Sequence, residues 1–85
     1  MNISKAEQRV LHLLAQGGHI RHTRSHAGKI AEILCITRDG LIFSDCDLPL
    51  FQRLRQRGLI ESRNGAPYRI SMRGRRSVRA QPDNR

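Results

Sequence analysis

The first periodic segment of the chain predicts a helix. Apolar residues recur at helical spacing between residues 6 and 14, at Ala6, Val10, Leu13 and Leu14 with Leu11 beside them. Ser4 and Glu7 have the spacing of a capping box, and two glycines at 17–18 provide a stop. The sequence therefore predicts an amphipathic helix over residues 5–16 whose apolar stripe joins the core.

Short runs with turn residues between them then predict two or three strands. Residues 19–25 and 30–37 are separated by Ala27-Gly28-Lys29, which is typical of a hairpin turn. The second run is apolar on both faces, so we expect it to be the central strand. Asp39-Gly40 is a strong tight-turn signal, and it predicts that residues 41–43 return as a third strand.

A second helix is expected to begin near residues 45–47. Asp47 is a good N-cap, and Pro49 fits only in a first helical turn. Three apolar residues would line the inner side of this helix, namely Leu50, Phe51 and Leu54. Gly58 is predicted to end it.

The last third of the chain predicts a second hairpin and a third helix. Residues 59–60 enter a strand, Asn64-Gly65 predicts a tight turn, and residues 68–70 form the return strand. Ser71 is a suitable cap for a helix over residues 72–80, which Pro82 would stop. Residues 81–85 are expected to form a flexible C-terminal tail.

These elements predict one small α+β domain over residues 1–80, because 85 residues provide a single modest core. Three helices and two β-hairpins, or one small antiparallel sheet, are expected. Residues 50–74 resemble the recognition helix, wing and following helix of winged-helix DNA-binding domains. Strands stand where such domains have a positioning helix, which weakens the case for DNA reading.

Positive charge is concentrated in the last third of the chain. The net charge is +9, and residues 53–85 contribute +8 of it, from ten arginines against Glu61 and Asp83. Such asymmetry favours an anionic partner, either nucleic acid or an acidic protein surface. Arg53 and Arg57, one helical turn apart, are expected to point outward together. The predicted partner- or nucleic-acid-binding residues are Arg53, Arg57, Arg63, Arg69, Arg73, Arg75, Arg76 and Arg79.

The residue pattern does not favour a metal site, a cofactor site or a membrane segment. Five residues are conceivable metal ligands (His19, His22, His26, Cys35 and Cys46), but no Cys-x-x-Cys accompanies them, so neither a metal nor another cofactor is predicted. No apolar run could span a bilayer, and no signal peptide is recognisable. We therefore expect a cytoplasmic protein with no membrane partner and with reduced thiols, although one disulfide is geometrically conceivable.

A small ribonuclease is an alternative reading. His12, His22, Tyr68 and Arg69 could supply an acid, a base and a phosphate clamp. Nothing in their spacing selects them, and His12 lies among leucines on the first helix. The expectation is therefore a binding protein and not an enzyme.

Several segments together resemble a known family. They include Asp45-Cys46, Leu59-Ile60-x-Ser62, Asn64-Gly65-x-Pro67-Tyr68-Arg69-Ile70 and Val78-Arg79-Ala80-Gln81-x-Asp83-Asn84-Arg85. They are similar to the YjhX toxin family of small bacterial proteins. That resemblance implies a toxin that inhibits DNA topoisomerase I by protein–protein contact, with an acetyltransferase-like protein as its antitoxin. A winged-helix transcriptional regulator that binds DNA and the ribonuclease toxin remain the alternatives.

Overall fold

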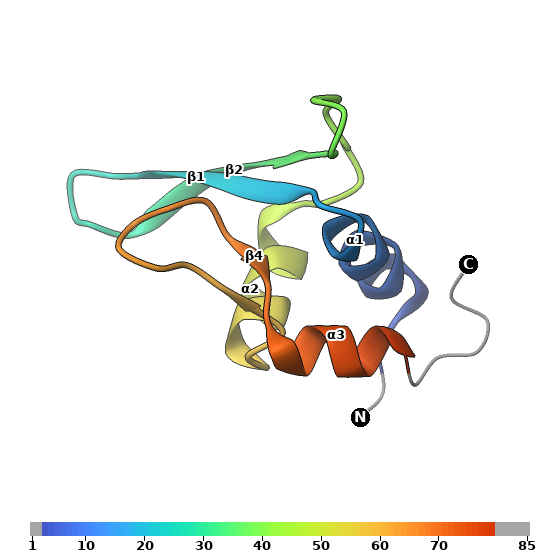
Figure 1. Ribbon diagram of the computed structural model, residues 1–85. Helices are drawn as coiled ribbons and strands as arrows, with labels where there is room; N and C mark the ends of the chain where they lie inside the picture. Colours follow the sequence, from blue (N-terminus) through green and yellow to red (C-terminus); the bar gives the residue numbers. More distant parts are fainter. Residues whose placement is uncertain (1–2, 80–85) are drawn as a thin grey trace.

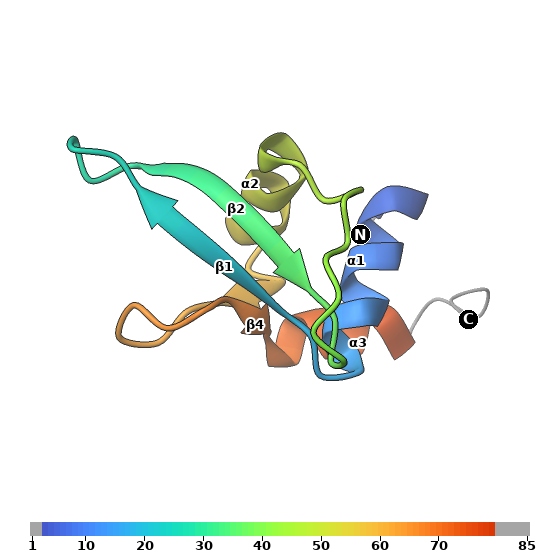
Figure 2. The same cartoon turned by 90° about the horizontal axis from the view of Figure 1, so that it is seen from above.

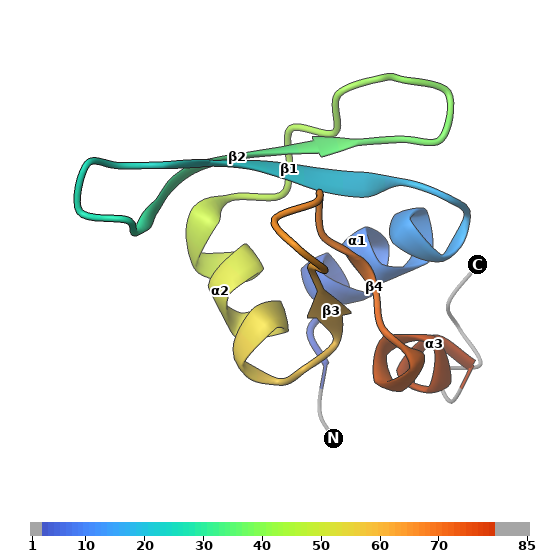
Figure 3. The same ribbon diagram turned by 60° about the vertical axis from the view of Figure 1, so that its left-hand side comes forward.

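Three helices lie on one side of a β-hairpin in the computed structural model, which describes residues 3–79 (Figures 1 and 3). The elements are α1 (Lys5–Ala15), β1 (His19–Arg24), β2 (Ile30–Ile36), α2 (Leu48–Gln56), β3 (Ile60–Glu61), β4 (Arg69–Ile70) and α3 (Met72–Arg79). The predicted α+β class, with three helices and two hairpins, is confirmed. The predicted tail, residues 81–85, lies outside the described residues.

Helix α1 begins and ends where its local sequence predicts. The Ser4 hydroxyl accepts a hydrogen bond from the Glu7 N–H at 3.1 Å, and the Glu7 carboxylate accepts one from the Ser4 N–H at 3.3 Å. This reciprocal pair is the capping box. At the other end the chain leaves the helix through Gly17, whose φ of 113° suits a glycine. None of the helices in the described region is long and apolar enough to cross a membrane.

Strands β1 and β2 pair antiparallel, with Ile20 opposite Cys35 and Arg21 opposite Leu34. The turn at Gly40 forms as predicted, with the Gly40 N–H donating to the Thr37 carbonyl at 2.9 Å. The expected third strand over residues 41–43 is wrong. Its pairing is limited to one bridge, between Ile36 and Ile42, because the chain then turns away from β2 towards the cap of α2.

Helix α2 and the second hairpin follow the predicted caps and turns. The Asp47 carboxylate caps α2 by accepting from the Leu50 N–H at 2.9 Å. Asn64 and Gly65 both have positive φ, 54° and 78°, which is the conformation of a type I′ turn. Strands β3 and β4 are only two residues each, so this hairpin is short.

One long-range pairing joins the two hairpins. Ile20 of β1 forms an antiparallel bridge with Tyr68, and each backbone N–H donates to the other's carbonyl at 2.8 Å. Tyr68 therefore lies beside β1, and this single bridge links the two separate two-stranded sheets. The local sequence predicts both hairpins but not this contact between them.

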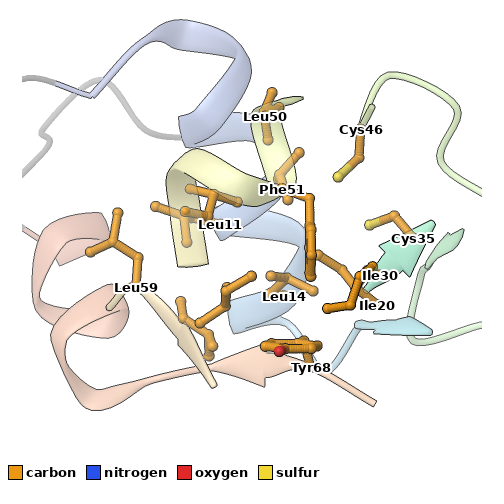
Figure 4. Close-up of a cluster of buried hydrophobic side chains, with 14 residues drawn as sticks. Leu11, Leu14, Ile20, Ile30, Cys35, Cys46, Leu50, Phe51, Leu59 and Tyr68 are labelled. Atoms are coloured by element: carbon orange, nitrogen blue, oxygen red, sulfur yellow. The ribbon is translucent and has the colours of Figure 1, made fainter. Parts of the chain in front are cut away.

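The core lies between the inner face of β1–β2 and the helices (Figure 4). Phe51 is fully buried at its centre, and its ring meets the Tyr68 ring edge-on with centroids 5.0 Å apart. Aliphatic residues from α1, α2 and the strands complete the core: Val10, Leu11, Leu14, Ile20, Ile30, Leu50, Leu54, Leu59, Ile60 and Ile70. Burial of these side chains is the main stabilising contribution in a chain with few aromatic residues.

Helix α3 begins immediately after β4 and packs closely against the second hairpin. The Ser71 hydroxyl accepts from the Gly74 N–H at 3.0 Å and donates to the Gly58 carbonyl at 2.6 Å. Gly74 is buried, and a Cβ there would collide with the Leu59 carbonyl oxygen and lie 2.7 Å from Ile70 Cγ1. A glycine is therefore required where α3 crosses the hairpin.

Gly74→Ala is expected to lower the free energy of unfolding by about 2 kcal/mol, because overpacking at a close backbone approach displaces α3. Ser77→Ala on the same helix is the matched control and should change stability by less than about 0.5 kcal/mol. Urea denaturation followed by circular dichroism measures both. Equal midpoints for the two variants would contradict the tight packing.

Candidate partner-binding surface

Two arginines predicted to bind a partner, Arg53 on α2 and Arg57 at its C-cap, reach towards Glu7 on α1. Arg57 Nη1 lies 3.2 Å from Glu7 Oε2, and Arg53 Nε lies 3.9 Å from Glu7 Oε1. The Glu7 side chain is only 4% exposed, whereas those of Arg53 and Arg57 are 49% and 37% exposed. The expectation that both arginines point outward is corrected for Arg57, because the buried carboxylate on α1 binds it, whereas Arg53 stays exposed with only the longer contact.

Glu7 therefore has two structural roles. It closes the capping box of α1, and it ties α1 to α2 through the two guanidinium groups. A buried carboxylate needs such partners because burial removes its hydration. Arg53 and Arg57 serve this internal contact, so they are less available to a partner than the sequence suggests.

The remaining arginines gather on the second hairpin and on α3. Arg63, Arg69 and Arg75 line a hollow of about 320 Å³ together with Pro67 and Ile70. Arg63 is 85% exposed at the side chain and lies 3.5 Å from Glu61, a weak surface ion pair. The structure thus brings three of the predicted residues to one place.

Arg73 and Arg76 are also exposed on α3, and Arg79 is the last residue of that helix. Within residues 3–79 no carboxylate forms an ion pair with Arg69, Arg73, Arg75 or Arg76. We call the arginines that line the hollow the arginine surface and define it as Arg63, Arg69 and Arg75. Arg73 and Arg76 lie elsewhere on α3.

Arg21 lies near Arg69, although the binding residues predicted from the sequence all lie in the last third of the chain. The Ile20–Tyr68 bridge places β1 next to β4, and hence Arg21 near Arg69. Burial lowers the pKa of His19, and the positive charges of Arg69 and Arg21 lower it further. Strand alternation could have grouped His19 with Arg21, but only the tertiary pairing adds Arg69.

The candidate metal ligands do not converge. His19 and His22 are three residues apart on β1 and so lie on opposite faces of the strand. Among the described residues, no three His, Cys, Asp or Glu side chains form a group that could hold a metal ion. Cys35 and Cys46 are free thiols, both buried, whose sulfur atoms point towards each other (Figure 4).

The candidate ribonuclease residues are also dispersed. His12 lies on α1, 3.2 Å from the Gln16 amide nitrogen, beside a separate hollow lined by Arg9 and Arg38. Tyr68 is buried and contacts His22 ring to ring, with centroids 5.1 Å apart. Arg69 is exposed, on the other face of the strand from Tyr68. The four side chains do not meet at one exposed position.

Arg57→Ala is expected to destabilise the protein by about 2 kcal/mol, because Glu7 would stay buried with only a distant partner. Arg53→Ala, which removes the longer and more exposed contact, should cost less than about 1 kcal/mol. Thermal unfolding of both variants at the same pH tests the difference. Equal losses of stability would contradict the greater dependence of Glu7 on Arg57 than on Arg53.

The two thiols should be unreactive in the folded protein. The Cys46 thiol donates a hydrogen bond to the Cys35 sulfur, and this contact, with burial, raises the pKa of Cys46. The same bond lowers the pKa of Cys35, but that side chain is only 1% exposed. Maleimide labelling followed by mass spectrometry should be about 100-fold slower than in urea. Labelling at the denatured rate would contradict the burial.

The whole chain matches a known protein family. A family model described as "Putative toxin of bacterial toxin-antitoxin pair", the YjhX toxin family, matches residues 1–85. No solved structure matches.

Three similar relatives are each called a UPF0386 protein. Those from Beijerinckia indica and Brucella anthropi are 61% and 62% identical over 85 residues, which is the full length of both chains in each pair. The relative from Rhodospirillum rubrum is 62% identical over 84 residues, covering 99% of this chain and 93% of that protein. The match to the family model and these full-length identities show that this chain belongs to the YjhX toxin family.

Proposed function

We propose that this protein acts as a toxin by binding DNA topoisomerase I and inhibiting it, without catalysing a reaction of its own. The toxin role is supported by the family description, and topoisomerase I by the resemblance that the sequence segments carry. The observation that favours a binding mechanism is the arginine surface, whose exposed guanidinium groups have few carboxylate partners in residues 3–79. The proposal requires the protein to work in the cytoplasm, and its antitoxin to be the acetyltransferase-like protein that the family resemblance implies.

Arginine suits such a contact on chemical grounds. Its planar guanidinium can donate two parallel hydrogen bonds to one carboxylate, and it is weakly hydrated compared with an ammonium group. Arg63, Arg69 and Arg75 surround one hollow, so a protruding acidic side chain of a partner would meet several donors there. Positive charge also accelerates encounters with an acidic surface at low salt.

Relaxation of supercoiled DNA by purified topoisomerase I tests the proposal. The wild-type protein should inhibit relaxation, and Arg69→Glu combined with Arg75→Glu should raise the half-inhibitory concentration at least about 10-fold, because two cations are reversed. Arg55→Glu is the charge control, since Arg55 is exposed on α2 outside the arginine surface. Absence of inhibition by the wild type at micromolar concentration would overturn the proposal.

A DNA-binding regulator is the second candidate, because Arg63 projects from a hairpin that resembles the wing of winged-helix proteins. Direct DNA binding would depend steeply on salt and would inhibit any enzyme acting on the same DNA. Cleavage of the same DNA by an unrelated restriction endonuclease should therefore be measured alongside relaxation, at the same protein concentrations. Equal inhibition of both enzymes would favour DNA binding, whereas inhibition of topoisomerase I alone supports contact with the enzyme.

A further inference from the structure

The joined hairpins present an uncovered outer face. Ile20 and Cys35 are paired and buried, so they point towards the helices. Their strand neighbours must point the other way, because side chains alternate along a strand. Ile42 lies opposite Ile36, and Arg69 follows the inward-facing Tyr68, so both share that outer side. We define the sheet face as the residues on this outer side: His19, Arg21, Thr23, Glu32, Leu34, Ile36, Ile42 and Arg69.

No helix of the described region covers this face. Viewed from above, β1 and β2 lie across the molecule with α2 behind them, and α1 and α3 lie near the end where β1 begins and β2 ends (Figure 2). Ile42 is 65% exposed and Leu34 is 39% exposed, and Leu41, next along the chain, is 67% exposed. A solvent-facing side of an antiparallel sheet is normally polar, so aliphatic residues gathered there are typical of a contact surface.

The other part of the sheet face is cationic. Arg21 and Arg69 both lie close enough to His19 to lower its pKa, so the three side chains share one positive region. Glu61, on the neighbouring strand β3, is within 3.5 Å of Arg63 and is already paired. The sheet face therefore combines an aliphatic part, at Leu34, Ile36 and Ile42, with a part whose net charge is positive, because Arg21 and Arg69 outnumber Glu32.

We propose that the sheet face is the docking site of the antitoxin, which would contribute a segment carrying aliphatic side chains beside carboxylates. Charge complementarity selects this occupant. A second copy of the chain would oppose two faces on which Arg21 and Arg69 outnumber Glu32, in a protein whose net charge is +9. DNA would satisfy the arginines but would leave Leu34, Ile36 and Ile42 without apolar contacts.

The way in which antitoxin binding would neutralise the toxin rests on the proposed function. Arg69 belongs to both the sheet face and the arginine surface, so the two surfaces meet at β4. An antitoxin docked on the sheet face would cover Arg69 and crowd the hollow that it shares with Arg63 and Arg75. Neutralisation then follows from occlusion of the target-binding surface, without any change in the fold.

Calorimetric titration with the purified acetyltransferase-like antitoxin tests the docking site. Ile42→Asp and Arg21→Glu should each weaken binding at least about 10-fold, because one buries a charge against apolar groups and the other repels carboxylates. Met72→Asp and Arg55→Glu are the matched controls and should stay within twofold of the wild type. Met72 is 65% exposed, like Ile42, but lies on α3. Thermal unfolding of every variant confirms that it is folded.

The outcomes separate the two proposals. If Ile42→Asp still inhibits topoisomerase I but is no longer neutralised by the antitoxin, both proposals are supported. If wild-type protein binds the antitoxin but does not inhibit topoisomerase I, only the proposed function fails. Unchanged affinity in both test variants, or no binding by the wild type, overturns the docking site. A wild-type dimer that Ile42→Asp dissociates, seen by light scattering, would assign the face to a second copy instead.

Discussion

The pairing of Ile20 with Tyr68 is the contact on which the rest of the arrangement depends. It links the two hairpins, each of which is a separate two-stranded sheet, and the second has strands of only two residues. An isolated hairpin of that length would be marginal in water. The bridge also directs the Tyr68 ring inward against Phe51, so backbone pairing and core packing support each other. The same pairing places Arg21 beside Arg69 and creates the outer sheet face.

Glu7 shows how one residue can decide which charges are available at the surface. Locally it completes a capping box, and across the fold it binds Arg53 and Arg57. A buried carboxylate must be paired, so these two guanidinium groups serve Glu7 although their side chains remain 49% and 37% exposed. Within residues 3–79, the predicted binding arginines from Arg63 to Arg76 form no ion pair with Glu7, and they lie on the second hairpin and α3.

Two adjoining surfaces give a physical basis for a toxin whose action can be switched off by a bound protein. The arginine surface is polar and suited to carboxylates, whereas the sheet face mixes aliphatic and cationic groups. A protein ligand on one would exclude a ligand from the other, because both include Arg69. Since the contact lies on a strand held by the core, no conformational change is required for such competition.

The sequence by itself determined the local elements of this protein. The Ser4–Glu7 cap, the Asp47 cap and the Asn64-Gly65 turn each act within four residues, so helices and hairpins were predictable to within a residue or two. Residues 41–43 form only one bridge to β2, between Ile42 and Ile36, and so do not make the third strand that the turn signal predicts. Only the tertiary structure decided that Arg53 and Arg57 turn towards Glu7 and that Arg21 joins Arg69. Those contacts join side chains some 50 residues apart in the chain. They form because of burial and strand pairing in the folded protein, so the local sequence pattern does not predict them.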